Sequence, residues 1–467
     1  MKSLKLWTLA ISLGVAMVAF GEVIYQENFD SLRTLDGFEQ HGGQWSIAEG
    51  KLVGRGNGYL ARILLPPVAK GQDIALEADF RMTYSPQPMN WASIFVRYVH
   101  GKVPVFIQMP VRYSGWTEIA EAKINEEGKF DWQVYRATQI GDKKKAEDFR
   151  RLRLEVRGIV AKTFVDGKPI ATTLLAGRTE HDGRVGICSS VTGIEIDNIV
   201  VETLPPVSAE EREKLLFEGS TRPLVIAHQG DFAQYPGNTL EAVRAAIVCG
   251  ADVVEVDVRL SMDNIPYCMH DDTVQGTTDG KGKGCEMTME QLKTLNAGFR
   301  RGEKFKHCKV PTFEEIVVEC KKTKTPILID LKEGRAAKAI CEILKAHDYF
   351  DSVLVGTGSA DTAKVFKSYH PGVTLIATSG YLDNPGQDYM LKLKRDGFDA
   401  VFTAFRRPFK VDVKLVRKSG LALYVWTIDN ASDVVAAWRH GADGIVTNEP
   451  EMALDTLKRI QRAIGEW

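Results

Sequence analysis

Residues 238–261 read NTLEAVRAAIVCGADVVEVDVRLS and join two patterns in direct succession. The first part, NTLEAVRAAIVCG, is an amphipathic helical pattern, and the second, VVEVDVRLS, is a short apolar run typical of a buried strand. The same alternation fills the C-terminal half, with further apolar runs at LVIAH, PILIDLK, SVLVGTG, VTLIATS, AVFTAF, ALYVWTID and GIVTNEP. Eight such strand–helix units predict a parallel sheet closed into a (β/α)8 TIM barrel over residues 223–467.

The N-terminal half has a different rhythm of short strands and turns. Its alternating stretches are WSIAEGKLVG, DIALEADFRMTY, WASIFVRYVH, FRRLRLEVRG, IVAKTFVDGKPIATTLL, DGRVGICSS and IEIDNIVVETL. Asp166-Gly167 separates two apolar alternations, as in a hairpin turn. We therefore predict an all-β antiparallel sandwich over residues 22–203 and a linker over residues 204–222, which are rich in Pro, Ser and charge.

The first 21 residues, MKSLKLWTLAISLGVAMVAFG, resemble a secretory signal peptide. Lys2 and Lys5 precede an apolar run, and small residues follow at the cleavage positions. An uncleaved anchor is the alternative, although the run is short for a membrane span. We expect an exported protein, periplasmic or secreted, without a stable membrane span.

Composition narrows the function classes. The 60 basic and 61 acidic residues give a net charge of −1 without long runs of one sign, which argues against nucleic-acid binding. Seven cysteines in 467 residues are not a disulfide framework. In an exported protein Cys285 and Cys308 could pair, whereas Cys249, Cys320 and Cys341 fall in helical patterns and Cys268 in a strand.

Polar residues gather at the predicted strand ends of the barrel, where barrel enzymes carry their active sites. Glu255 and Asp257 are two residues apart and point to one face of their strand, and Asp330 ends the next strand. Three carboxylates in one low-dielectric mouth would repel one another, so a hard divalent cation, Mg²⁺ or Ca²⁺, is the natural occupant.

Two histidines and a lysine complete this set. His228 ends the first strand, His270 follows the second in YCMHDD, and Lys332 lies two residues after Asp330. Together these side chains suit metal-assisted hydrolysis with paired acid–base residues. Taken singly, each has a structural alternative: a buried structural histidine, a carboxylate pair bridged to Arg259 or Lys332, or an exposed strand end.

Residues 224 to about 455 resemble the glycerophosphodiester phosphodiesterases, which are (β/α)8 barrels. The matching stretches include IAHQG, PGNTLEAVRAAIVCGADVVEVDVRLSMDNIPYCMHDD, VPTFEEI, ILIDLK and YVWTIDNASDVVAAWRHGADGIVTNEP. The resemblance implies cleavage of a glycerophosphodiester into glycerol 3-phosphate and an alcohol. It places the general acid and base on His228 and His270, the metal ligands on Glu255, Asp257 and Asp330, and substrate contacts on Lys332 and Trp426.

Several positions depart from the family pattern. Gln229 stands where the family usually has Arg, Gly237 replaces its usual Glu, and Gly276 stands where a further Arg is expected. Asn448 replaces a common Asp, and Asp330 replaces a Glu. Loss of an Arg removes a bidentate grip on phosphate that Gln229, a candidate substrate-binding residue, cannot reproduce. Lys332 and Arg259 are candidates to compensate.

The N-terminal region resembles the concanavalin A-like lectin and glucanase sandwiches, in particular the branch related to 3-keto-disaccharide hydrolases. The stretches that carry this resemblance are Trp45–Gly54, residues 164–168, residues 183–186 and Asp197-Asn198. It implies a carbohydrate ligand for the sandwich, and a structural or partner-docking module is the alternative.

Three functional hypotheses follow for the whole chain. The first is a metal-dependent phosphodiesterase for small glycerophosphodiesters with altered substrate preference. The second is a metal-dependent enzyme that cleaves glycosidic bonds on the same barrel. The third is a non-catalytic protein that binds a sugar or a lipid headgroup.

Overall fold

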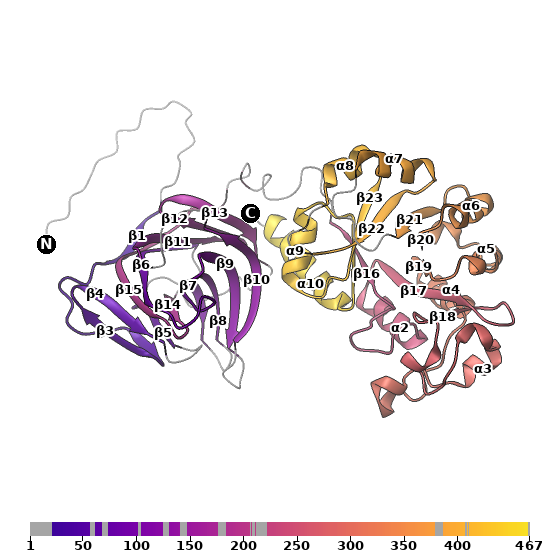
Figure 1. Ribbon diagram of the computed structural model, residues 1–467, viewed down its shortest axis with the longest axis horizontal. Helices are drawn as coiled ribbons and strands as arrows, with labels where there is room; N and C mark the ends of the chain where they lie inside the picture. The colour runs from indigo at the N-terminus through magenta and orange to yellow at the C-terminus, as the bar shows by residue number, and fades with distance from the viewer. Residues whose placement is uncertain are drawn as a thin grey trace. The chain divides into compact units, whose positions relative to one another are not determined.

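The computed structural model describes residues 21–56, 61–67, 73–100, 104–124, 130–140, 147–175, 184–205, 207, 211, 222–378, 386–406, 409 and 411–465. It divides into two compact units that change over near residue 207. The N-terminal unit consists of antiparallel sheets and the C-terminal unit is a barrel, so the predicted fold class is confirmed (Figure 1). The bounds 22–203, 204–222 and 223–467 remain predictions. The signal-peptide segment, apart from Gly21, and most of the linker lie outside the described residues.

The N-terminal unit is built from two antiparallel sheets. The first has the order β13 (Lys168–Leu174), β12 (Val160–Val165), β11 (Arg150–Arg157), β6 (Ile74–Tyr84), β15 (Gly193–Thr203), β4 (Lys51–Arg55) and β3 (Gln44–Ala48), with β1 (Val23–Glu27) paired to β15. The second has the order β10 (Phe130–Gln139), β9 (Trp116–Ile124), β8 (Val105–Arg112), β7 (Trp91–Val99), β14 (Arg184–Ser189), β5 (Ala61–Leu64) and β2 (Glu39–His41).

Alternation of side chains explains why β6 and β11 are central. In β6 residues 74–76 are all buried, and from there buried Leu76, Ala78, Phe80 and Met82 alternate with the charged residues 77, 79 and 81. β11 repeats the pattern with buried residues at 152, 154 and 156. The predicted hairpin turn at Asp166-Gly167 joins β12 to β13, and both residues have positive φ values, 50° and 74°.

The barrel of the C-terminal unit contains eight parallel strands. Their order is β16 (Leu224–Ala227), β24 (Gly444–Thr447), β23 (Ala422–Trp426), β22 (Ala400–Ala404), β21 (Thr374–Thr378), β20 (Val353–Thr357), β19 (Ile327–Leu331) and β17 (Val253–Leu260), and β16 also pairs with β17. That last pairing closes the barrel. The short strand β18 (Pro266–Cys268) adds antiparallel to β17.

The eight predicted helical patterns are also helices in the structure. They are α2 (Leu240–Cys249), α4 (Phe313–Thr323), α5 (Ala337–Ala346), α6 (Ala360–Tyr369), α7 (Gln387–Arg395), α8 (Val413–Lys418), α9 (Ala431–Arg439) and α10 (Pro450–Gly465). Helix α2 begins where the Thr239 side chain accepts a hydrogen bond from the Ala242 N–H, and it ends at Gly250, whose φ is 86°.

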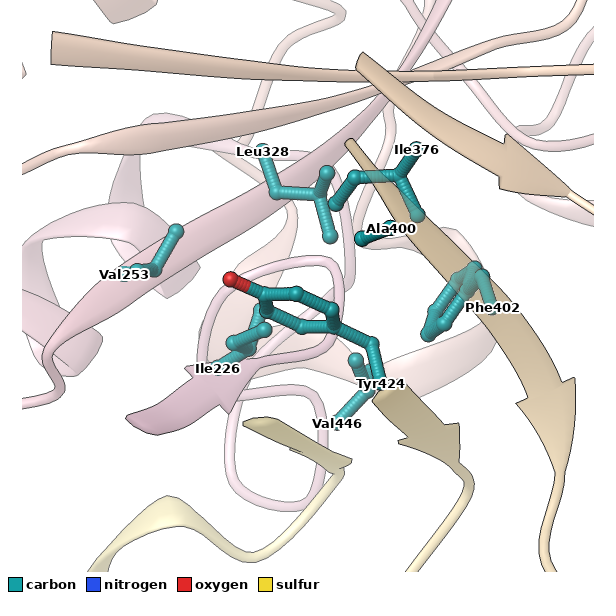
Figure 2. Packing of buried hydrophobic residues seen from close by; sticks show 8 residues of the cluster. All are labelled: Ile226, Val253, Leu328, Ile376, Ala400, Phe402, Tyr424 and Val446. Carbon is teal, nitrogen blue, oxygen red and sulfur yellow. The ribbon is translucent and has the colours of Figure 1, made fainter. Parts of the chain in front are cut away.

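Apolar side chains fill the barrel. Figure 2 shows Tyr424 amid side chains from other strands, and the cluster also contains Ile226, Val253, Leu328, Ile376, Ala400, Phe402 and Val446. Because these eight residues come from seven of the eight barrel strands, the cluster fixes which face of those strands points inward. It is the reference from which the polar strand ends can be placed.

The segment between β18 and α4 forms an insertion with its own small core. It contains α3 (Met289–Thr294) and the 3₁₀ turns η1 (Val274–Gly276), η2 (Gly284–Glu286), η3 (Phe299–Arg301) and η4 (Glu303–Phe305). The suggested Cys285–Cys308 disulfide is wrong for this structure, because all seven cysteines are free thiols. Cys308 is instead completely buried against Glu241 and His307.

Among the described residues, no helix is long and apolar enough to cross a membrane.

Candidate active site

The interior cluster fixes the direction of the polar strand ends. Side chains two residues apart on a strand share a face. The inward-facing residues Ile226, Val253, Leu328, Tyr424 and Val446 therefore direct the residues two or four positions later toward the same mouth. Those residues are His228, Glu255, Asp257, Asp330, Lys332, Trp426 and Asn448.

Three carboxylates come together in this mouth. One oxygen each from Glu255, Asp257 and Asp330 lies within 4.8 Å of the others. Glu255 and Asp257 are almost completely buried, and Asp330 is partly exposed. Burial, and then the charges of Asp257 and Asp330, raise the pKa of Glu255 well above its ordinary value.

Lys332 is the cation that meets these carboxylates. Its Nζ lies 2.6 Å from Asp330 Oδ2 and 2.9 Å from Asp257 Oδ1. Burial lowers the pKa of Lys332, but the two aspartates outweigh it and leave that pKa above its ordinary value. The ammonium group therefore stays charged, and it balances one of the three acidic groups.

The donor set fits a hard divalent cation. All three groups offer carboxylate oxygens, the ligands preferred by Mg²⁺ and Ca²⁺. In addition, Asp257 Oδ1 accepts no hydrogen bond of good geometry from the described residues, although it is buried beside Lys332. A buried oxygen left in this way is available to a metal ion.

Gln229 takes part in holding the carboxylates. Its N–H donates to Glu255 Oε2 at 2.6 Å, and its Nε2 donates to Asp257 Oδ2 at 2.9 Å. The side chain uses the space that Gly237 leaves empty, because a Cβ at position 237 would lie 2.4 Å from Gln229 Oε1. The two departures from the family pattern, at 229 and 237, are thus sterically coupled.

Asn238 holds Asp257 from both the side chain and the backbone. Its Nδ2 donates to Asp257 Oδ2 at 2.7 Å, and its Oδ1 accepts from the Asp257 N–H at 2.9 Å. Sequence reasoning did not single out Asn238 as a site residue. The available signal was its place in the PGNT loop, directly before helix α2.

The hydrogen bonds of Asn448 and Asp429 determine which ring nitrogen of His228 carries the hydrogen. His228 Nδ1 is 2.7 Å from Asn448 Oδ1, and Asn448 Nδ2 donates to Asp429 Oδ2 at 2.8 Å. Because an ionised carboxylate can only accept, Asp429 fixes the amide with its oxygen toward His228. Nδ1 must then carry the hydrogen, and Nε2 of a neutral His228 keeps a free lone pair. Asp429 is a second residue that sequence reasoning missed, although it is the last residue of the quoted stretch ALYVWTID.

Hydrogen bonds to backbone carbonyls hold the segment that carries His270 against β17. The Met269 N–H donates to the Asp257 carbonyl at 3.0 Å, and the Arg259 guanidinium donates to the His270 carbonyl. Arg259 also pairs with Glu333. These contacts occupy the Arg259 guanidinium, as those with Asp257 and Asp330 occupy the Lys332 ammonium, so compensation by either residue for the missing phosphate-binding Arg stays a prediction.

The His270 imidazole has a charged partner. Its Nδ1 lies 2.8 Å from Asp271 Oδ1, and the ring is half exposed. Gly276 leaves room for this pair, since a Cβ there would lie 2.5 Å from Asp271 Oδ2. The two histidines therefore differ in their partners: a neutral amide oxygen for His228 and a carboxylate for His270.

Trp426 is the last residue of β23. It packs partly buried against the barrel cluster, with its ring centroid 6.1 Å from that of Phe402. The predicted site residues His228, Gln229, Glu255, Asp257, Asp330, Lys332 and Trp426 thus come from strand ends β16, β17, β19 and β23, with His270 after β18. Their functional roles are taken up below as proposals.

Comparison with known proteins agrees with this architecture. The sequence model of the glycerophosphoryl diester phosphodiesterase family matches residues 228–452. A glycerophosphodiester phosphodiesterase of Caldanaerobacter subterraneus subsp. tengcongensis is 28% identical over 250 residues, which cover 51% of this chain and 99% of that protein. Human glycerophosphodiester phosphodiesterase 1 is 42% identical over 127 residues, which cover 27% of this chain and 38% of the human protein.

A solved structure is also similar to part of this chain. A phosphodiesterase of Oleispira antarctica, solved in complex with sn-glycerol-3-phosphate, is 25% identical, with a TM-score of 0.47 over 50% of this chain and 97% of its own. By the match of the family's sequence model, residues 228–452 form a domain of the glycerophosphoryl diester phosphodiesterase family, which places the C-terminal half of the chain among the phosphoric diester hydrolases.

Proposed function

We propose that the barrel hydrolyses glycerophosphodiesters to glycerol 3-phosphate and an alcohol with the help of a divalent cation. The observation that carries this proposal is the excess of acid in the mouth: within the described part of the chain, Glu255, Asp257 and Asp330 lie together and Lys332 is the one basic side chain that pairs with them. A buried cluster of three carboxylates needs a further positive charge. A divalent cation that acts on a phosphodiester, the substrate of this family, would supply it.

Glu255, Asp257 and Asp330 would hold the cation, for which Mg²⁺ and Ca²⁺ are the candidates because all the ligand atoms are carboxylate oxygens. When bound, it would polarise the phosphoryl oxygens of the substrate. Lys332 would then be released from Asp257 and Asp330 and become available to a phosphate oxygen.

The hydrogen bonds of the two histidines support different roles for them. In neutral His228, Nε2 carries the free lone pair, so His228 is proposed as the general base that activates the nucleophile, either water or the glycerol 2-hydroxyl. The His270 ring has a carboxylate as its partner instead, with Nδ1 2.8 Å from Asp271 Oδ1, and its Nε2 is the atom proposed to give a proton to the leaving alcohol. We therefore assign His270 as the general acid.

Gln229 and Gly237 are proposed to shift substrate preference. Gln229 gives its amide to Asp257 and offers no charge to phosphate. The double substitution Gln229→Arg with Gly237→Glu restores the usual family pair, whereas either single change introduces one unbalanced charge. We expect the double variant to lower KM for a glycerophosphodiester more than the two single variants together would suggest, as a double-mutant cycle measures.

The central test uses purified full-length protein with glycerophosphocholine and glycerophosphoglycerol, with Mg²⁺ or Ca²⁺ and with EDTA. Metal-dependent release of glycerol 3-phosphate, lost in Asp330→Asn, supports the proposal. Cleavage of oligosaccharides without any release of glycerol 3-phosphate would favour the glycosidic hypothesis, for which the neutral Gln229 is the one supporting feature. Binding of these compounds without turnover would favour a non-catalytic protein.

We propose export for this chain on the strength of residues 1–21 alone. Amino-terminal sequencing of the protein from a secreting host should begin at Glu22, and an intact Met1 would contradict the proposal. A carbohydrate ligand for the sandwich rests on its family resemblance, and a glycan array with residues 22–203 and the full chain would test it.

A further inference from the structure

A second group of metal-binding side chains lies outside the mouth of the barrel. Glu241, His307 and Cys308 each present one ligand atom, and these atoms lie within 4.8 Å of one another. His307 Nε2 is 3.8 Å from Glu241 Oε1 and 3.9 Å from Cys308 Sγ. Zinc bonds of about 2.0–2.3 Å in a tetrahedral arrangement leave ligand atoms roughly 3.3–3.7 Å apart. The two separations from His307 therefore exceed these values by only a few tenths of an ångström.

The chemistry of this set differs from that of the mouth. It combines a carboxylate, an imidazole and a thiol, and nitrogen and sulfur donors select zinc over Mg²⁺ or Ca²⁺. Cys308 is completely buried with its thiol hydrogen-bonded to Glu241, whereas His307 is mostly exposed. The cluster is thus anchored on its inner side and open to water on its outer side.

We propose that Glu241, His307 and Cys308 bind a zinc ion, with a water molecule as the fourth ligand. Binding replaces the proton on Cys308 Sγ, which passes to solvent, and forms bonds from the metal to Sγ, to His307 Nε2 and to a Glu241 oxygen. The two negative charges of the thiolate and carboxylate then balance Zn²⁺. No change in oxidation state is required.

The surroundings of Cys308 explain why its thiol keeps its proton when no metal is bound. Burial, and then the Glu241 carboxylate, raise the pKa of the Cys308 thiol to about 12. A bound metal deprotonates a coordinating thiol, so affinity should rise with pH. Without metal the thiol remains a neutral donor to Glu241.

The zinc ion would connect two parts of the barrel domain. Glu241 lies in the first turn of α2, directly after the loop that contains Asn238, and His307 and Cys308 end the insertion before α4. Binding would therefore clip the insertion to the helix that follows the Asp257-binding loop. We expect this to stabilise the domain without supplying a group to the reaction.

Cobalt gives a direct test, because a thiolate ligand produces an intense charge-transfer absorption that oxygen ligands in the mouth cannot produce. Metal-free full-length protein, kept reduced, should develop this band when titrated with Co²⁺ and lose it when Zn²⁺ is added. His307→Ala, at an exposed position, should weaken Zn²⁺ affinity by at least tenfold, and Cys308→Ser should abolish the band.

Matched control variants show whether the absorption band and the Zn²⁺ affinity come from this site. His347→Ala removes a histidine that pairs with Glu314 without a nearby thiol ligand, and Cys285→Ser removes another free thiol. Both should keep the band and the affinity, as should Asp330→Asn in the mouth. Absence of the band in wild-type protein, or its persistence in both Cys308→Ser and His307→Ala, would overturn the proposal irrespective of whether the chain is a phosphodiesterase.

Discussion

Charged side chains are arranged in opposite ways in the two units of the molecule. On the first sheet of the sandwich, Arg153 meets Glu77, Glu155 and Glu202, and Arg81 meets Glu195. Arg151 adds contacts with Glu77 and Asp79, so basic and acidic groups alternate across the strands. In the barrel mouth, by contrast, three carboxylates face a single lysine.

This contrast distinguishes charges that serve the fold from charges that serve a ligand. Acidic and basic side chains that alternate on a sheet surface, here called the ladder, pair with one another. Such surface ion pairs add little to the free energy of unfolding. Buried like charges cost free energy in the protein alone, and that cost is recovered when a cation or substrate binds. The mouth should therefore respond strongly to substitution in activity, and the ladder weakly in stability.

The largest effect is expected for His228→Ala. Removing the proposed general base should lower kcat about 10²–10⁴-fold with little change in melting temperature, because His228 is only half-buried. Steady-state kinetics with glycerophosphocholine would measure this, with His347→Ala as the control. Activity within a factor of three of wild type would remove His228 from the mechanism.

Glu255→Gln should separate stability from function. Folding raises the pKa of Glu255, so this group stabilises the folded state only while protonated, and its contribution is lost as the pH rises through the folded pKa. In EDTA the metal-free wild type should lose stability above about pH 4.3, by about 1.4 kcal/mol for each unit of pKa increase. The variant should lack this loss.

The same Glu255→Gln variant should have little metal-dependent activity, since one ligand has become neutral. Chemical unfolding at a series of pH values in EDTA, together with the phosphodiesterase assay, gives both readouts. If the variant is less stable than wild type at pH 7 without metal, the Glu255 carboxyl group does not destabilise the metal-free protein, which contradicts the prediction.

Gly276→Ala should affect catalysis by about tenfold, equivalent to about 1.4 kcal/mol in the barrier. The added methyl group would displace the Asp271 carboxylate, which is exposed and can swing away from His270. Loss should appear in kcat, and Asp271→Asn should reproduce it. Gly386→Ala, where an added Cβ meets nothing within 4 Å, is the control.

The smallest effect is expected in the sandwich ladder. Glu195→Gln breaks the 2.6 Å contact with Arg81, at a position where both side chains are partly exposed. The free energy of unfolding should fall by about 0.2–1 kcal/mol. Thermal unfolding and the phosphodiesterase assay together would detect it, and a large loss of activity would contradict the division between the two regions.

The barrel could be predicted almost completely, whereas part of the sandwich could not. Each barrel strand is a short apolar run followed by a helical pattern, so period and order are both visible in the chain. Strands β1, β2, β5 and β8 to β10 were not identified individually. In β8 nearly all residues are buried and Pro110 interrupts the pattern, so the two-residue alternation that marks a half-buried strand is missing.

The site shows the same division between pattern and packing. The acidic residues were found because their spacing places them on one strand face. Asn238 and Asp429 were not, because each acts by orienting another side chain, and the same residue types are common in turns and caps. The Cys285–Cys308 suggestion failed for a related reason, since separation along the chain says nothing about direction in space.

By itself the sequence determined the two architectures, the order of the barrel strands and the acidic and imidazole groups at their ends, because local spacing dictates which side chains share a face. The tertiary structure alone decided where the hydrogen of His228 lies, since Asn448 is 220 residues away. It also decided that Gln229 fills the space beside Gly237 and binds Asp257, because that outcome depends on steric contact across a folded loop.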